Sequence, residues 1–380
     1  MQRTDVRVLI LGGGVIGTSI AYHLAARGAD VTVVERNAIA CAASGKSGGF
    51  LALDWCDGTA LMSLARRSFA LHAELAENLG SDWDYRRMTS YAGIVGRSPS
   101  RMRRTGPWWI SSNVVINGQL GSTNTTAQVN PAAFTSGMMR AAEEQGAKMR
   151  LGQAKGLMRR DADVIGVQLE GEALEADAVV IAMGPWSILA AQWLPLPPVF
   201  ALKGHSLVFE TGTTLPSEAL FLEYADSTGA TVSPEVFPRP DGTTYVCGIS
   251  SESLPPVDPA FVAPDERAID RLKALCDRMS PVLATAPVLA SQACYRPVTA
   301  DGLPLIGPVP GARGAFVATG HSVWGILNAP ATAEAMAELI LDGAPRRIDL
   351  SPFDPARVAP LDPERLTDPQ LRRRAVPTDR

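Results

Sequence analysis

A glycine-rich turn near the start of the chain constrains its fold more than any other feature. The turn reads Gly12-Gly13-Gly14-Val15-Ile16-Gly17, follows a strand-like run at Val6–Leu11 and opens a helix expected over Val15–Ala26. In this context Gly12 permits the tight bend, Gly14 lets the backbone approach a pyrophosphate, and Gly17 lets the helix pack closely on the strand. The N–H groups at the helix start, Val15 and Ile16 among them, then face the phosphates. The sequence therefore predicts a Rossmann-like dinucleotide site.

An acidic residue follows at the place that such a site requires. Glu35 comes directly after a second expected strand, Val31–Val34, and 23 residues after Gly12. A carboxylate there accepts hydrogen bonds from ribose hydroxyls and repels a 2′-phosphate, which disfavours NADP. The alternative is a glycine turn in an ordinary α/β protein with Glu35 as a solvated charge. We favour the dinucleotide site because the strand, the glycines, the helix and the acid all occur in the order that such a site requires.

The fingerprint alone does not distinguish FAD from NAD. After Glu35 the chain carries a loop of small and hydroxyl-bearing residues, Ala43–Phe50. A cofactor as long as FAD reaches well beyond the first βαβ unit, and such a loop suits its far end. A flexible surface loop is the alternative interpretation.

Composition excludes several classes of protein. The chain has 380 residues, of which 46% are hydrophobic and 19% charged, and this balance permits a large core and argues against disorder. Its net charge of −4 lacks the basic surplus of a nucleic-acid binder. The five cysteines and four histidines show no metal-ligand spacing, so we expect no metal. With no leader pattern and no membrane-length apolar run, we expect a cytoplasmic protein without a membrane span.

Several further segments resemble one family, the D-amino-acid oxidase superfamily, whose members include glycine oxidase and monomeric sarcosine oxidase. The resemblance covers about residues 5–342, and its most specific part lies near the C-terminus. The loop at 48–55 is more similar to a branch of FAD-dependent oxidoreductases found in yeast and plants. The segments that carry the resemblance are the opening unit, Ser44–Phe50, Val129–Pro131, Ala176–Ser187, Cys294–Gly307 and Gly320–Thr332.

The resemblance implies an α/β fold in which a Rossmann-like FAD-binding domain carries a discontinuous, β-rich substrate domain. The FAD-binding domain is expected over 1–84, 129–199 and 291–345, the substrate domain over 85–128 and 200–290, and a C-terminal tail over 346–380. We expect the tail to wrap the surface or to be loose, rather than to be a functional arm. Alternating strand and helix patterns along the first and last segments favour the same division.

The activity implied is oxidation of the C–N bond of an amino acid or secondary amine by hydride transfer to flavin N5. Oxygen is the expected electron acceptor, giving hydrogen peroxide. An amine dehydrogenase that uses another acceptor, a flavoprotein with a binding or regulatory role, and an NAD-dependent dehydrogenase are the alternatives. The partner is thus a small amine or amino acid, and the oligomeric state stays open.

The family pattern assigns the substrate-binding role to Arg296, at the position where glycine oxidase holds the substrate carboxylate. A planar guanidinium suits a carboxylate because it donates two parallel hydrogen bonds. A structural salt bridge is the alternative. Leu327 stands where sarcosine oxidase has a carboxylate-binding lysine, which argues against sarcosine as the substrate.

Other residues receive cofactor or catalytic roles by the same resemblance. Gly325 and Ile326, expected between strand 315–318 and helix 329–341, would direct N–H groups at the flavin pyrimidine carbonyl. Cys294 matches the flavin-linked cysteine of sarcosine oxidase, but a buried free thiol is favoured over a covalent link. Lys46 and His321 are candidate catalytic residues beside the flavin, with an exposed lysine and a structural histidine as alternatives. Further residues expected to contact the cofactor are Arg36, Ser44, Ser47, Gly48, Gly49, Gly184 and Leu327.

Overall fold

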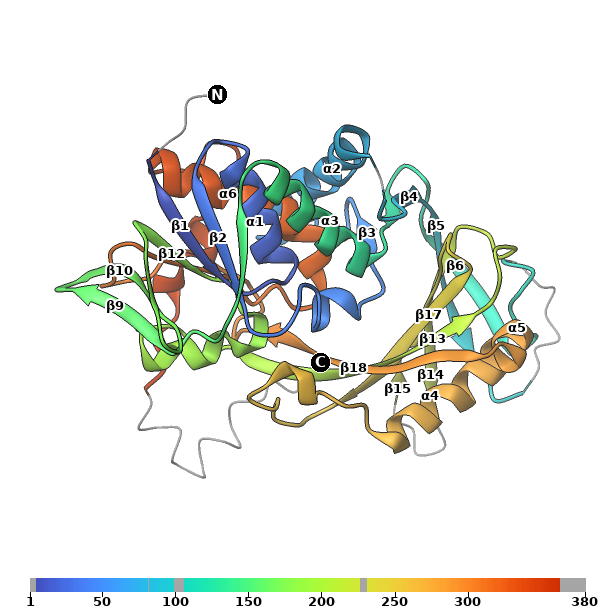
Figure 1. Ribbon diagram of the computed structural model, residues 1–380. Coiled ribbons are helices and arrows are strands. Elements are labelled where there is room, and N and C mark those ends of the chain that lie inside the picture. The colour runs from blue at the N-terminus through green and yellow to red at the C-terminus, as the bar shows by residue number, and fades with distance from the viewer. Residues whose placement is uncertain (1–4, 81, 99–105, 226–230, 363–380) are drawn as a thin grey trace.

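Two β-sheets lie side by side in the molecule, one covered by helices and one larger and curved (Figure 1). The computed structural model describes residues 5–80, 82–98, 106–225 and 231–362. Parallel strands with helices and a second, β-rich layer confirm the expected α/β class with a Rossmann-like unit.

The first sheet is the Rossmann-like one. Its central strand β1 is a continuous aliphatic run, buried from Val8 to Leu11, as a strand covered on both faces requires. Its neighbours β2 and β12 both run parallel to it, whereas the edge strand β19 is antiparallel to β20. In order across the sheet the strands are β19 (Leu305–Pro308), β20 (Ala315–Thr319), β12 (Ala178–Ile181), β1 (Arg7–Leu11), β2 (Asp30–Glu35) and β8 (Lys148–Leu151).

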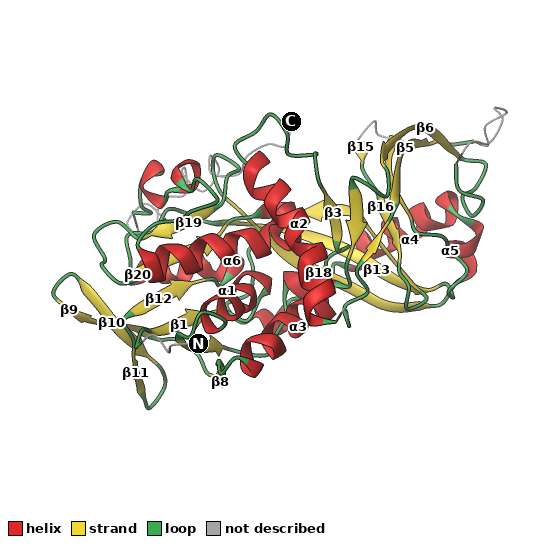
Figure 2. Ribbon diagram, turned by 90° about the horizontal axis from the view of Figure 1, so that it is seen from above, coloured by secondary structure: helices red, strands yellow, loops and turns green. Residues whose placement is uncertain are grey.

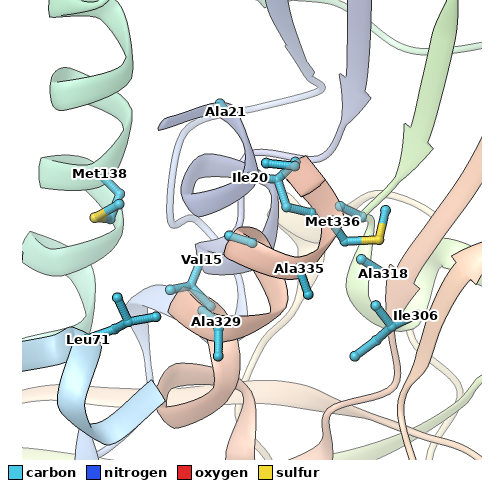
Figure 3. Packing of buried hydrophobic residues seen from close by; sticks show 14 of the residues in the cluster. Val15, Ile20, Ala21, Leu71, Met138, Ile306, Ala318, Ala329, Ala335 and Met336 are labelled. Atoms are coloured by element: carbon cyan, nitrogen blue, oxygen red, sulfur yellow. The ribbon is translucent and has the colours of Figure 1, made fainter. Parts of the chain in front are cut away.

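Helices cover one face of this sheet. They are α1 (Val15–Ala25), α3 (Pro131–Glu144) and α6 (Gly325–Asp342), with α2 (Met62–Leu79) packed outside α6 (Figure 2). Small side chains such as Ala329 and Ala335 on α6 let this helix pack against Val15 and Ile20 of α1 (Figure 3). A small antiparallel sheet covers the opposite face: β9 (Gly156–Arg160), β10 (Asp163–Gln168) and β11 (Ala173–Glu175).

The second large sheet is mixed and mainly antiparallel. One of its faces packs on two consecutive helices, α4 (Glu266–Met279) and α5 (Pro281–Thr285), through an apolar cluster that includes Leu207 and Val246. The other face looks toward the first sheet. Its strands in order are β18 (Val288–Val298), β13 (Phe200–Glu210), β17 (Thr243–Ser251), β16 (Glu235–Pro238), β14 (Glu218–Ala225), β5 (Thr89–Val95) and β6 (Val114–Gly121), with β15 (Thr231–Val232) paired to β14.

A third small sheet lies between the helices and the second large sheet. It consists of β3 (Phe50–Ala52), β7 (Thr126–Gln128) and β4 (Arg86–Arg87). From 348 to 362 the chain packs back on the first sheet: Phe353 is buried, and Arg357 binds Asp301. Expectations for residues 363–380 lie outside the described residues, and the domain boundaries stay a prediction.

The start of the last helix differs from the sequence-based expectation. Helix α6 begins at Gly325, four residues before the expected Ala329, and contains Pro330 in its second turn. A proline lacks the N–H that a helix interior uses, so the sequence favours a start beside it. Contacts from α2 replace the missing bond.

None of the helices that the structure describes combines the length and the apolar composition of a membrane span.

Candidate active site

A cavity of about 930 Å³ lies beyond the carboxyl ends of β1 and β2, and strands of the second large sheet also line it. Its lining comes from the glycine turn, from the end of β2, from the start of α6, and from strands β13, β16, β17 and β18. Ligands of open α/β sheets bind at this edge, beyond the carboxyl ends of the strands. The volume is at the upper end of the range for small-molecule sites.

The glycine turn has the close contacts that its sequence predicts. Gly12 has a φ of +116°, and a Cβ atom there would lie 2.4 Å from the carbonyl oxygen of Ala182. A Cβ atom on Gly17 would lie 2.0 Å from the carbonyl oxygen of Gly12, so helix and turn meet backbone to backbone. Gly14 is open on the cavity side, and among the described residues outside its own turn a Cβ atom there would come nearest to Ser44 Oγ, at 3.1 Å. Bulkier residues would break the turn or fill the cavity.

The end of β2 offers a carboxylate already fixed in place. Glu35 is buried and accepts hydrogen bonds from the backbone N–H of Gly13 at 2.7 Å and of Asn37 at 2.8 Å. Arg36, predicted to contact the cofactor, lines the cavity and also reaches the segment between β17 and α4, where it pairs with Asp258 at 3.2 Å and donates to the carbonyl of Val257. Arg36 therefore connects the end of β2 to this segment.

The small-residue loop lies between the two large sheets. The one-turn 3-10 helix Ala43–Gly45 positions Ser44, whose Oγ accepts from the N–H of Val15 at 2.9 Å. The Ser47 hydroxyl is buried and has no hydrogen-bond partner among the described residues, although it borders the cavity. Arg239 donates to the Ser47 carbonyl at 3.0 Å. A buried hydroxyl without a protein partner is unfavourable by itself and fits a polar ligand.

The start of α6 is held in shape by α2. Pro330 cannot donate to the carbonyl of Ile326, and His72 Nε2 meets this oxygen at 2.9 Å instead. Ser68 Oγ likewise accepts from the N–H of Ala331 at 2.9 Å. Burial lowers the pKa of His72 to about 4, so its ring is neutral and donates one proton to the carbonyl. The first N–H groups of α6 therefore have a fixed orientation at the cavity.

Most of the predicted site residues meet in this cavity. The lining includes Gly12, Gly14, Val15, Ile16, Glu35, Arg36, Ser44, Ser47, Gly48, Gly184, Cys294, Arg296, His321, Gly325 and Ile326. The structure therefore brings together segments that are far apart in the sequence. Their individual roles stay predictions.

Four predicted residues do not line the cavity: Gly17, Lys46, Gly49 and Leu327. Gly17 and Gly49 lie behind the cavity. A Cβ atom on either residue would clash with a backbone carbonyl oxygen. Leu327 is buried in the core. Lys46 is half-buried. Burial raises the pKa of the Cys294 thiol, and the positive charges of Arg296 and Lys46 oppose this rise.

His321 and Arg296 differ in charge. Burial lowers the pKa of His321 to about 3, so the ring is neutral, and its Nε2 lies 3.1 Å from Thr332 Oγ1. Arg296 lies on β18, and its guanidinium packs over Gly204. A Cβ atom on Gly204 would lie 3.6 Å from Arg296 Nη2. The guanidinium also donates to Ser250 Oγ. A neutral histidine supplies hydrogen bonds only, whereas Arg296 brings a positive charge to the cavity.

Several polar residues of the cavity wall were not predicted from the sequence. Glu235, Tyr245 and Cys247 lie on β16 and β17 and line the cavity. The alternating pattern around them indicates strands, but it does not show which face looks toward the first sheet. His72 and Ser68 carried no signal, because their partners lie more than 250 residues later in the chain.

Comparison with known proteins gives consistent results. A family model described as FAD dependent oxidoreductase matches residues 7–339. Glycine oxidase of Pseudomonas aeruginosa is 28% identical over 379 residues, covering 92% of this chain and 98% of that protein. A Schizosaccharomyces pombe protein, whose name gives an oxidoreductase and no substrate, is 30% identical over 383 residues, covering 92% and 97%.

Solved structures show the same fold. The glycine oxidase of Geobacillus kaustophilus superposes with a TM-score of 0.77 at 22% identity, covering 93% of this chain and 99% of that one. Iminodiacetate oxidase from Chelativorans gives a TM-score of 0.76 at 20% identity, covering 94% and 100%.

Proposed function

The chain belongs to the DAO family of FAD-dependent oxidoreductases, and we propose that it oxidises the C–N bond of an amino acid or secondary amine. The observation that carries this proposal is the position of Arg296. Its guanidinium lies on the wall of the cavity that also contains the dinucleotide turn. An arginine in such a place suits the carboxylate of an amino acid.

The residues of the cavity fit FAD along its length. Glu35 would bind the ribose, the N-terminus of α1 the pyrophosphate, and the loop with Ser44, Ser47 and Gly48 would border the flavin. When bound, FAD supplies a hydride acceptor at flavin N5. The N–H groups of Gly325 and Ile326, in the first turn of α6, have no partner within their own helix and would stabilise negative charge on the ring.

Arg296 would orient the substrate by its carboxylate, which places the C–N bond at a fixed distance from the ring. His321 would provide a neutral hydrogen-bonding group at the side of the cavity. Neither residue has to be a base, because an amine that reaches its neutral form in the site can react directly.

The proposal is tested by mixing the purified holoenzyme with a panel of amino acids and secondary amines without oxygen. We expect at least one of them to bleach the flavin absorption. Admission of oxygen should restore the colour and produce hydrogen peroxide if oxygen is the acceptor, as we propose. Bleaching that only a quinone or another acceptor reverses would identify a dehydrogenase. A flavin that no amine bleaches would contradict the proposed function.

We further propose that FAD is bound without a covalent link. Thioether formation at the flavin 8-methyl group needs a reactive thiolate, and burial raises the pKa of the Cys294 thiol. Acid precipitation of the purified protein should therefore release the yellow colour into the supernatant. Colour that stays in the wild-type pellet and is lost in Cys294→Ala would contradict this prediction.

A further inference from the structure

The face of the second large sheet that looks into the cavity carries an acid as well as Arg296. Glu235 on β16 pairs in register with Cys247 on β17, and both line the cavity. The Cys247 thiol lies 3.5 Å from Glu235 Oε2 and donates to it. Burial raises the pKa of this thiol well above its ordinary value, so it stays a neutral donor. The acid thus has a weak neutral partner inside the protein.

Among the described residues, the half-buried Glu235 has no ionic partner. Within the described residues it forms no ion pair, since no lysine, arginine or histidine nitrogen comes within 4.0 Å. Burial raises the pKa of Glu235, and the charge of Arg296 opposes this rise without a direct contact. An unpaired acid in such surroundings is unfavourable in the free protein and is stabilised by a cation.

The cavity wall therefore presents a guanidinium and a carboxyl group to one space. Among the described residues, Arg296 and Glu235 form no hydrogen bond or ion pair with each other, although the charge of Arg296 opposes the rise in the pKa of Glu235. A molecule with a carboxylate at one end and a protonated nitrogen at the other complements both. A simple carboxylate would satisfy Arg296 and leave the acid unpaired.

Resting on the proposed function, we propose that Glu235 binds a protonated nitrogen of the substrate and makes the site selective for amino acids over simple carboxylates. That nitrogen is the α-amino group as the substrate binds, before it reaches the neutral form that reacts, or a basic group of the side chain. Both have the same chemistry, a cationic N–H donor, and the substrates used in the test separate them.

The test compares Glu235→Gln with wild-type holoenzyme in two measurements. One is kcat/KM for amino acids with neutral and with basic side chains. The other is the affinity for acetate, read from the perturbation of the flavin spectrum. Glutamine keeps the size of the side chain and removes its charge. We expect kcat/KM to fall about 10- to 100-fold, as for loss of a charged hydrogen bond, while acetate binds as well as before or more tightly.

The substrates show which nitrogen is bound. A fall for all amino acids assigns Glu235 to the α-amino group, and a fall confined to basic amino acids assigns it to the side chain. An unchanged kcat/KM for both classes would overturn the inference. Equal weakening of acetate and amino acids would also overturn it, because that is the result of a general disturbance of the wall.

A matched control comes from the same sheet. Glu218 on β14 is also an acid whose pKa burial raises, but it does not line the cavity. Glu218→Gln should leave the ratio of amino-acid to acetate binding unchanged. Glu235→Asp, which keeps the charge, serves if Glu235→Gln loses its flavin, and it should retain selectivity for amino acids.

Failure of the proposed function is recognisable separately. If no amino acid reduces the wild-type flavin, the proposed oxidation fails. Amino-acid binding is then followed by the perturbation of the oxidised flavin spectrum. A loss of this signal in Glu235→Gln with acetate binding intact would still support the role of Glu235, and an equal signal in both proteins would refute it.

Discussion

Replacing Arg296 with methionine should lower kcat/KM for the amino-acid substrate by about 10³-fold, within the 2–5 kcal/mol that truncating one partner of a buried charge pair costs. Methionine keeps much of the side-chain volume but cannot donate to a carboxylate. Most of the loss should appear in KM, since the arginine binds a part of the substrate that does not react. Steady-state kinetics with the holoenzyme measures the effect.

Two comparisons make the Arg296 result specific. Arg296→Lys should recover part of the activity, because the charge returns without the two-pronged geometry. Acetate should lose its effect on the flavin spectrum in Arg296→Met, in contrast to Glu235→Gln. A kcat/KM within about threefold of wild type in Arg296→Met, with FAD bound, would show that the carboxylate is held elsewhere.

Replacing His72 with alanine should destabilise the protein by about 3 kcal/mol. The change leaves the carbonyl of Ile326 buried without a donor and removes a ring that contacts Phe134 with 4.7 Å between centroids. Because Ile326 lies in the first turn of α6 and lines the cavity, FAD affinity should fall as well. Urea unfolding of the holoenzyme and FAD titration of the apoprotein measure the two effects.

Controls for His72 use the same helix and the effect of pH. Glu77→Ala, on the exposed side of α2, should change stability by less than about 0.5 kcal/mol.

The pKa of His72 in the folded protein is about 4, below the ordinary 6.5. The stabilising effect of the neutral ring is therefore complete above pH 6.5 and is lost as the pH falls toward 4. The unfolding free energy of His72→Ala should therefore depend less on pH between 6.5 and 4 than that of wild type. Equal slopes would show that the ring is not neutral in the fold.

Local patterns explain which features could be predicted from the sequence. The strand, turn and helix around Gly12–Gly17 depend on neighbours in the chain, so spacing alone predicted them. The Arg296 assignment came from a family pattern, and the structure places it on the cavity wall, while its role stays to be tested. Glu235 was missed because alternation in a strand does not show which face is covered. The early start of α6 was missed because Ser68 and His72 compensate for Pro330 from a distant segment.

The strand order of the first sheet has a consequence for how the protein is made. Strand β1 is complete within the first eleven residues, yet it pairs with β12 at 178–181, and β12 pairs with β20 at 315–319. During synthesis β1 therefore waits for β12 to cover its second edge, and β12 keeps an unpaired edge until β20 emerges, a situation that slows folding and invites aggregation. The residues expected to surround the flavin, Arg296 and Gly325 among them, arrive in the same late segment. Completion of the sheet and of the expected cofactor site therefore depends on the same segment, and chains shortened to end before β20 lack both.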